Sequence, residues 1–287
     1  MRRLLRWAGY ALATLSGLVL LAAILVYGIT ERRFGREYDA PLPAITVLTD
    51  SATVARGEHL ASTLGCRGCH GPDLGGEELF SFLVPVGGRV VAPNLTRQRA
   101  RYTDAELARV IRIGVRSDGS STLAMPTQML HHLSDEDVAA IIAYVRTRPE
   151  VGTDLPRTVM GPLMRALILR EGVQPGPERV ARDAPRAADR LDGSPERLGE
   201  YIAYTSCSEC HGADLHGSDD GSRPDLAIAG AYSLEQFARL MRDGIALGER
   251  ELGMMSDVAR GRFSHFTDEE VAALHEYLRT RAAQPSS

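Results

Sequence analysis

The hydrophobic pattern begins with one long apolar run. No charged residue occurs between Trp7 and Thr30, and about twenty apolar residues in a helix are enough to cross the hydrocarbon core of a bilayer. A cleavable signal peptide is the alternative, but its apolar region has only about 7–15 residues and ends at a small-residue cleavage site. The residues that follow Tyr27 offer no such site. We therefore predict that residues 1–35 form an uncleaved N-terminal membrane anchor.

Beyond the anchor, the spacing of apolar residues is that of helices. Apolar side chains recur every three or four residues in two segments, around Ile141 and around Leu274. Four segments begin with Ser or Thr and carry Glu, Asp or Gln three residues later, which is the pattern of a helix capping box. These pairs are Thr103/Glu106, Ser134/Asp137, Ser233/Gln236 and Thr267/Glu270. The pattern predicts an all-α fold.

The sequence also predicts where two helices begin and where loops lie. Asp50 or Ser51 can begin one helix, and Ser194 followed by Pro195 can begin another. No stretch alternates strictly between apolar and polar residues, and the Gly-rich segments are predicted to be loops. Those segments are Gly71–Gly76, Gly87–Gly88 and Gly212–Gly221.

The chain also repeats itself. The string Cys66-Arg-Gly-Cys-His-Gly-Pro-Asp-Leu-Gly-Gly matches Cys207-Ser-Glu-Cys-His-Gly-Ala-Asp-Leu-His-Gly, and the segments that follow match in the same order. Such self-similarity indicates two copies of one structural unit. We predict a first domain at residues 36–149 and a second at residues 195–287. Residues 150–194, rich in Pro, Arg and Asp, are predicted to be a linker with one short apolar helix.

Composition narrows the function classes. The 287 residues include 33 basic and 37 acidic ones, for a formal charge of −4, and every basic residue is Arg. No basic stripe is present, so the sequence carries no nucleic-acid-binding footprint. Aromatic residues make up only 6% of the chain. Two small domains this poor in aromatic side chains need something else to fill their cores.

The cysteines indicate what fills these cores. All four lie in two C-x-x-C-H strings, each the attachment signature of c-type haem. C-x-x-C also occurs in redox disulfides and zinc sites, but every cysteine here belongs to a motif that ends in His. We predict two covalently bound haem c groups, with a porphyrin filling each core. Their predicted ligands are the thiols of Cys66, Cys69, Cys207 and Cys210, with iron bound by His70 and His211.

A methionine in each domain is the predicted sixth iron ligand. Met125 lies 11 residues after Gly114, and the same count from the matching Gly244 selects Met255. Met254 is a direct rival to Met255. Four spare histidines are further alternatives, although exposed positions or positions beside the haem propionates suit them better: His59, His131, His132 and His265.

At these residues the sequence resembles a known family. The part after the anchor resembles two tandem class I cytochrome c domains, and the anchor makes it similar to membrane-bound dihaem cytochromes that serve bacterial periplasmic dehydrogenases or terminal oxidases. The Met125-Pro126 pair is similar to the axial Met of that family, whereas Ser256 stands where the second domain would carry the proline.

The resemblance also implies two structural contacts. A Gly on the first helix of each domain should meet an aromatic residue on the last, which places Gly57 against Tyr144 and Gly199 against Tyr277. A proline carbonyl should accept a hydrogen bond from the ligating imidazole, which implicates Pro93 and Pro224. A plain structural turn at each proline is the alternative, because the spacing from the His differs between the domains.

We expect this arrangement to transfer single electrons rather than to act as an enzyme. Covalent haem attachment in this family takes place outside the bacterial cytoplasm, so we predict a single-pass inner-membrane protein with both domains in the periplasm. Its expected partners are a donor dehydrogenase and a respiratory acceptor, either an oxidase or another cytochrome. A peroxidase-like dihaem enzyme with one open haem site is the alternative, and a haem-based sensor is a third hypothesis.

Overall fold

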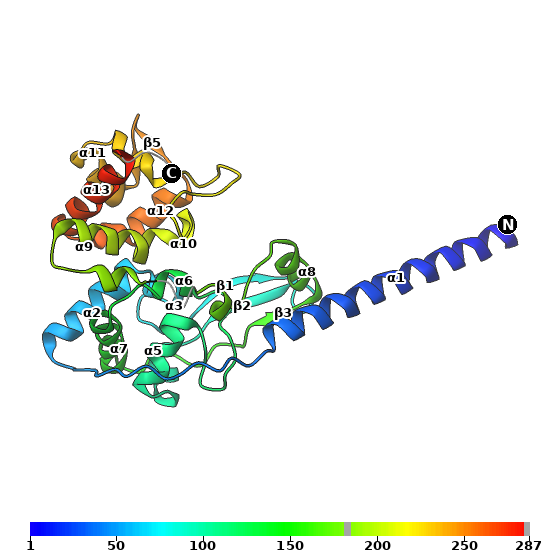
Figure 1. Cartoon of the computed structure of the whole chain (residues 1–287). Helices are drawn as coiled ribbons and strands as arrows, with labels where there is room; N and C mark the ends of the chain where they lie inside the picture. Colours follow the sequence, from blue (N-terminus) through cyan, green and yellow to red (C-terminus); the bar gives the residue numbers. More distant parts are fainter. Residues whose placement is uncertain (181–184, 284–287) are drawn as a thin grey trace.

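The computed structural model describes residues 1–180 and 185–283 of the chain, as one long helix and two helical domains (Figure 1). Helix α1 (Arg2–Phe34) projects away from the rest of the molecule. Its most apolar 18-residue window has a mean hydropathy of 2.3, and none of that window is buried. Length and composition therefore make α1 a candidate membrane span, as the apolar run predicted.

The first domain contains six α-helices and one 3-10 turn between residues 51 and 147. They are α2 (Ser51–Thr63), α3 (Cys66–His70), α4 (Leu95–Gln98), η1 (Arg99–Arg101), α5 (Asp104–Ile113), α6 (Thr127–Leu130) and α7 (Asp135–Thr147). Asp50 caps α2, since its carboxylate accepts from the N–H groups of Ala52 and Thr53. That cap is one of the two starts that the sequence predicted there.

The second domain repeats this order. Its elements are α9 (Pro195–Ile202), the π-helical segment η4 (Ala203–Cys207), α10 (Ser208–His211), η5 (Leu226–Ala231), α11 (Leu234–Asp243), β4 (Ile245–Ala246), β5 (Arg250–Glu251), α12 (Met254–Gly261), η6 (Phe263–His265) and α13 (Asp268–Ala283). Ser194 caps α9 with Pro195 in its first turn, as predicted.

The first and last helices of each domain cross at a glycine. A Cβ built on Gly57 would lie 1.9 Å from the carbonyl oxygen of Ala140 and 2.8 Å from Cβ of Tyr144. Only glycine permits α2 and α7 to approach this closely. The second domain repeats the crossing of α9 and α13 with Gly199, Ala273 and Tyr277. Both contacts implied by the family resemblance are confirmed.

The helix caps also follow the prediction, with one exception. Complete capping boxes form at Thr103 and Ser233, and Thr267 exchanges both hydrogen bonds with Glu270. The Ser134 hydroxyl accepts from the N–H of Asp137, but the Asp137 carboxylate does not return the bond. That carboxylate is directed to the second domain instead.

A small antiparallel sheet departs from the prediction of loops. Strands β1 (Glu77–Phe82), β2 (Gly88–Ala92) and β3 (Val159–Met160) lie in the order β1-β2-β3. The prediction of a loop at Gly87–Gly88 was wrong at Gly88, which begins β2. All six residues of β1 are exposed, so no buried face imposes the alternation that reveals a strand. The sheet is small, and the all-α class holds.

Residues 150–180 and 185–194 pack beside the first domain. Strand β3 pairs with β2, and α8 (Pro162–Arg170) packs against α1. Two 3-10 turns follow, η2 (Gly176–Glu178) and η3 (Ala187–Arg190). The predicted apolar helix of this segment is confirmed, and it is a structural element of the molecule rather than a free tether. The predicted domain boundaries at 149/150 and 194/195 stay predictions.

Candidate cofactor sites

The first C-x-x-C-H string forms the short helix α3. Nδ1 of His70 lies 2.9 Å from the carbonyl oxygen of Pro93, so the ring N–H donates there and leaves Nε2 as the unprotonated nitrogen. Burial lowers the pKa of His70, opposed by this hydrogen bond. A neutral imidazole with a free Nε2 is the form that binds a metal.

The second motif reproduces this geometry. Nδ1 of His211 lies 2.8 Å from the carbonyl oxygen of Pro224, although 13 residues separate this pair and 23 separate the first. The predicted proline contact is therefore confirmed in both domains. The different loop lengths are absorbed between the motif and the proline rather than at the imidazole.

Each motif is followed by a leucine in the left-handed backbone region. Leu74 and Leu215 have φ angles of 64° and 65°, and both side chains are fully buried. Their N–H groups donate to the carbonyls of Gly71 and Gly212, at 3.0 and 3.1 Å. A non-glycine residue in this conformation costs of order 1 kcal/mol. The same unfavourable conformation in both copies indicates that each motif requires the same tight turn directly after it.

The thiols fit covalent attachment. All four cysteines are free in the described chain, and burial raises the pKa of Cys66 to about 11 and that of Cys207 to about 12, each opposed by the charge of Arg262. In the parts of the chain that the structure describes, Nε2 of neither His70 nor His211 has a hydrogen-bond partner. Two thiols and an unpaired imidazole nitrogen in each motif are the donor set that haem c requires.

The methionines are sorted by their burial. Met129 and Met241 are fully buried in their domain cores, as packing residues would be. Met125 and Met255 are partly buried and pack against the edge of their cores. Met254, the rival of Met255, is 70% exposed. The structure therefore places one partly buried methionine at the predicted position of each domain.

In each domain, one side chain makes hydrogen bonds to the backbone of the segment that carries the predicted methionine ligand. The Arg179 guanidinium donates to the carbonyls of Met125 and Leu123, at 2.6 and 3.1 Å. In the second domain the fully buried Ser256 hydroxyl donates to the carbonyl of Gly244 and accepts from the N–H of Leu252 at 2.7 Å. Ser256 thus joins its loop to Gly244, the residue that caps the C-terminus of α11.

Arg262 lies between the two motifs. Its Nε donates to the carbonyl of Thr63, just before the first motif, at 3.3 Å, and its Nη1 pairs with the Glu209 carboxylate, inside the second motif, at 3.0 Å. A Cβ on Gly65 would be 2.9 Å from this guanidinium. One side chain from α12–η6 therefore spans both attachment segments. Neither motif pattern nor periodicity marks Arg262 in the sequence.

Comparison with known proteins agrees with this geometry. The family model described as Cytochrome c matches twice, at residues 54–149 and 197–282. These matches cover more than half of the chain and coincide with the two repeats. The chain belongs to the cytochrome c family. Membership implies covalently bound haem c and a role in electron transfer.

Several curated relatives of this cytochrome are named as cytochrome subunits of dehydrogenases. It is 25% identical to the fructose dehydrogenase cytochrome subunit of Gluconobacter japonicus, over 95% of this chain and 60% of that protein. It is 24% identical to the cytochrome c subunit of the quinone alcohol dehydrogenase of Gluconobacter oxydans, over 82% of this chain and 56% of that subunit. The cytochrome thus spans less than two thirds of the length of either relative.

A shorter relative matches one domain. Cytochrome c-554(548) of Halomonas halodenitrificans is 39% identical over 90 residues, which is 31% of this chain and 89% of that protein. The matched stretch is about as long as one of the two family-model matches.

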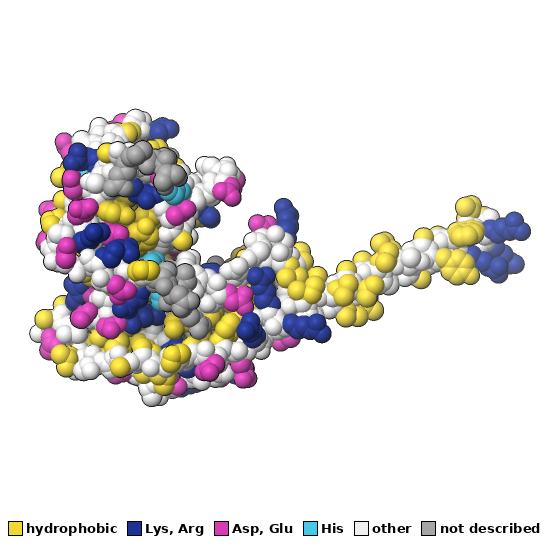
Figure 2. Space-filling model, viewed as in Figure 1, with side chains coloured by type: hydrophobic (Ala, Val, Ile, Leu, Met, Phe, Trp, Pro, Cys, Tyr) yellow, Lys and Arg dark blue, Asp and Glu magenta, His cyan; other side chains and the backbone are white. Residues whose placement is uncertain are grey.

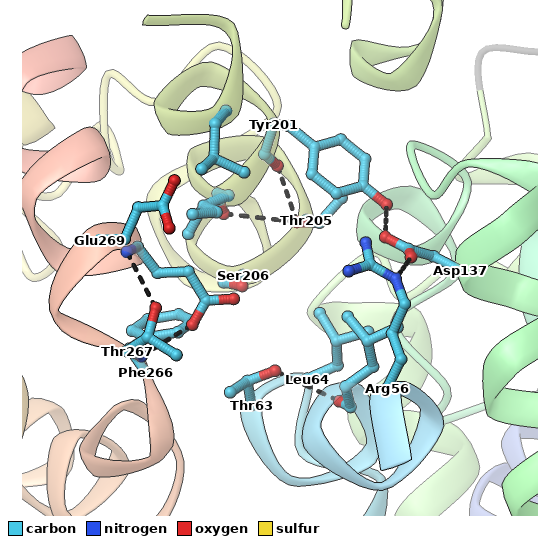
Figure 3. Close-up of a pocket in the computed structure, with 14 residues that line it drawn as sticks. Arg56, Thr63, Leu64, Asp137, Tyr201, Thr205, Ser206, Phe266, Thr267 and Glu269 are labelled. Carbon is cyan, nitrogen blue, oxygen red and sulfur yellow. Dashed lines mark hydrogen bonds and ion pairs between the residues drawn. The ribbon is translucent and has the colours of Figure 1, made fainter. Parts of the chain in front are cut away.

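The two domains of this cytochrome meet at a polar contact that includes a buried carboxylate (Figure 3). The Tyr201 hydroxyl donates to the Asp137 carboxylate at 2.6 Å and accepts from the N–H of Ser134 at 3.1 Å. Arg56 pairs with the same carboxylate at 2.5 Å. Burial and the Asp137 charge raise the pKa of Tyr201, so its hydroxyl stays protonated and can donate. These groups line a cavity of about 280 Å³ between the domains.

Two of the spare histidines, His59 and His132, contact other parts of the cytochrome. His59, which the sequence placed at the surface or beside a propionate, pairs across the interface with Glu270 at 2.8 Å. Nδ1 of His132 accepts from the N–H of Ala187 at 3.1 Å, and its ring lies 5.2 Å from that of Tyr204. Burial lowers the pKa of His131 to about 4. The contacts of His59 and His132 join segments far apart in sequence, so no local signal could have revealed them.

Proposed function

We propose that this cytochrome carries two covalently bound haem c groups, one in each domain, and transfers single electrons through them. Cys66 and Cys69 would hold the first and Cys207 and Cys210 the second. The iron ligands would be His70 with Met125, and His211 with Met255. When bound, each haem supplies a reversible one-electron change at iron.

The chain's own residues prepare each site for that task. The carbonyls of Pro93 and Pro224 orient the two imidazoles and fix the tautomer whose Nε2 can bind iron. A thioether as the sixth ligand raises the reduction potential relative to a second imidazole and closes the iron to small molecules. Because both domains place a methionine at the matching position, neither site favours the peroxidase-like alternative.

The observation that carries the proposal is the meeting of two equivalent motifs across one interface. Arg262 touches the segment before Cys66 and pairs with Glu209 between Cys207 and Cys210. Two cofactor sites that share one contacting side chain are adjacent, which suits passage of electrons from one to the other.

Partners and location complete the proposal. The relatives are named as cytochrome subunits of fructose and alcohol dehydrogenases, which supports a dehydrogenase as the electron donor. The acceptor would be an oxidase or another cytochrome of the respiratory chain. We place α1 across the inner membrane and both domains in the periplasm, where covalent haem attachment takes place. The chain itself would be the electron-transfer subunit and not the catalytic one.

Haem counting tests the central claim. Intact-mass measurement and the pyridine haemochrome spectrum of the full chain should give two haem equivalents. The double variants Cys66→Ala/Cys69→Ala and Cys207→Ala/Cys210→Ala should each lose one equivalent and retain the other. A wild-type chain that holds only one haem would overturn the proposal.

Ligation is tested separately by absorption and electron paramagnetic resonance. Both ferric haems should be low-spin and show the methionine-to-iron charge-transfer band, and Met125→Ala should remove that band from one of them. A high-spin ferric signal from one haem of the wild-type protein would instead support the peroxidase-like alternative.

A further inference from the structure

Exposed apolar side chains gather on one hairpin and one helix beside α1. The hairpin β1–β2 and its turn carry six of them, and α8 carries two. We call this set the apolar tip; it consists of Leu79, Phe80, Phe82, Leu83, Val84, Val86, Leu163 and Leu167. Leu83, in the turn of the hairpin, is 66% exposed. Clusters of this kind on a soluble surface mark contact with a membrane or another protein.

The apolar tip is joined to the end of α1 through α8. The Arg165 side chain on α8 is nearly buried and donates to the Thr30 hydroxyl at 2.6 Å and to the Glu31 carboxylate at 3.0 Å. Its guanidinium also lies over the Tyr27 ring, 4.4 Å from the centroid. Three contacts from one buried side chain hold α8 against the last turns of α1.

The hairpin is held against α8 in turn. The N–H of Leu163 donates to the carbonyl of Val86 at 3.0 Å. A Cβ on Gly161 would lie 2.1 Å from the carbonyl oxygen of Pro85, so the hairpin turn sits directly on the start of α8. Leu163 and Leu167 are four residues apart and therefore share one face of α8. The position of the apolar tip relative to α1 is thus fixed.

The sequence of α1 indicates the depth of the apolar tip relative to the bilayer. Glu31 is the first charged residue after the apolar run, and Arg32 and Arg33 follow it, so the hydrocarbon core must end close to Thr30. Tyr27 is the aromatic residue typical of that boundary. Since Arg165 contacts Tyr27, Thr30 and Glu31, α8 lies at the depth where α1 leaves the hydrocarbon. Figure 2 shows hydrophobic side chains gathered where α1 joins the rest of the molecule.

We propose that the apolar tip inserts into the interfacial region of the same bilayer that α1 crosses. This inference rests on the proposed membrane anchor. We expect lipid to cover the apolar tip, because the tip is held against the anchoring helix and lies at the depth of the lipid head groups. Arg32 and Arg33 add positive charge there, which suits anionic lipids. The contact would fix the first domain at one height and one orientation on the membrane surface.

The test uses the full holoprotein in vesicles of phosphatidylethanolamine and phosphatidylglycerol. The four native cysteines are consumed by haem attachment, so Leu83→Cys introduces a single free thiol for a nitroxide spin label. Ile228→Cys, an exposed apolar position in the second domain, is the matched control. Electron paramagnetic resonance then measures collisions of each label with oxygen, which enters lipid, and with a water-soluble nickel complex.

We expect the label at position 83 to be several-fold less accessible to the nickel complex than the label at position 228, and more accessible to oxygen. Equal nickel accessibility in a chain that resists alkaline washing would overturn the lipid contact and leave the anchor intact. Release of the chain by that wash would overturn the anchor and this proposal with it. Shielding of position 83 in native membranes but not in these vesicles would assign the apolar tip to a protein partner.

Discussion

Tyr201→Phe should weaken the contact between the two domains. The Tyr201 hydroxyl donates at 2.6 Å to the Asp137 carboxylate, which is only 1% exposed. The same hydroxyl accepts from the N–H of Ser134 at 3.1 Å. A hydrogen bond to a charged group contributes about 1.5–3 kcal/mol. Asp137 keeps its Arg56 partner in the variant, so we expect a loss of about 2 kcal/mol in the free energy of unfolding.

Thermal unfolding of the full chain in detergent, followed by circular dichroism, measures this loss. For two domains that unfold together, each kcal/mol lowers the melting temperature by about 2–4 °C, so Tyr201→Phe should lower it by about 4–8 °C. Tyr232→Phe is the control, because the Tyr232 hydroxyl makes no hydrogen bond with any described residue. A double-mutant cycle with Asp137→Asn should give a coupling energy of about 1 kcal/mol.

Equal melting temperatures for Tyr201→Phe and Tyr232→Phe would refute the reasoning, as would a coupling energy near zero. Either result would mean that the buried hydroxyl–carboxylate contact does not hold the domains together in solution.

Three more predictions follow from the same structure. The hydrogen bond that the His59 ring donates to the Glu270 carboxylate raises the pKa of His59 above 6.5. Burial acts to raise the pKa of Glu270, but the hydrogen bond from His59 outweighs it, so the pKa of Glu270 falls below 4.5. The raised value stabilises the fold up to about pH 6.5 and is lost above it, and the lowered value stabilises the fold from about pH 4.5 upward; His59→Gln should therefore cost about 0.5–1 kcal/mol at pH 5.5 and less at pH 9, measured by urea unfolding. Met255→Ala should remove one methionine-to-iron absorption band, whereas Met254→Ala should keep both, because Met254 faces solvent. Gly57→Ala should separate α2 from α7 and lower the haem content of the first domain alone, measured by mass spectrometry of proteolytic fragments.

Each of these predictions has its own contrary outcome. A cost of His59→Gln that is the same at pH 5.5 and pH 9 would exclude the ion pair as its source. Loss of the band in Met254→Ala with both bands kept in Met255→Ala would reverse the assignment of the second ligand. Gly261→Ala, where a Cβ would meet nothing within 4 Å, is the control for Gly57→Ala, and equal haem loss in the two variants would rule out the helix crossing as the cause.

Local patterns predicted the helices and the two motifs because each depends on residues close together in sequence. Capping residues act over three positions, and the thiols of each motif are three residues from one another, so one sequence is enough to find them. The repeat then carried the prediction from Met125 to Met255, which no motif marks. The family resemblance implies the proline contact of each imidazole, and the contact forms in both domains although the second loop is ten residues shorter.

What joins the domains could not be predicted in this way. Asp137 looks like the acid of a capping box, yet its carboxylate is used by Tyr201, 64 residues away. His59 meets a partner 211 residues away. Strand β1 gave no signal because neither of its faces is buried. Sequence spacing carries information on local geometry, whereas these contacts depend on how two finished domains fit together.

The interface also bears on how far the duplicated unit has kept its independence. Tyr201 of the second copy belongs to the buried cluster of the first, together with Leu60, Leu64 and Leu133. A first copy expressed alone would lose Tyr201 from that cluster and leave the Asp137 carboxylate without its tyrosine. Duplication has therefore been followed by mutual adaptation: the copies still share a backbone plan, but neither could be exchanged for a free-standing single-domain cytochrome without rebuilding the surface between them.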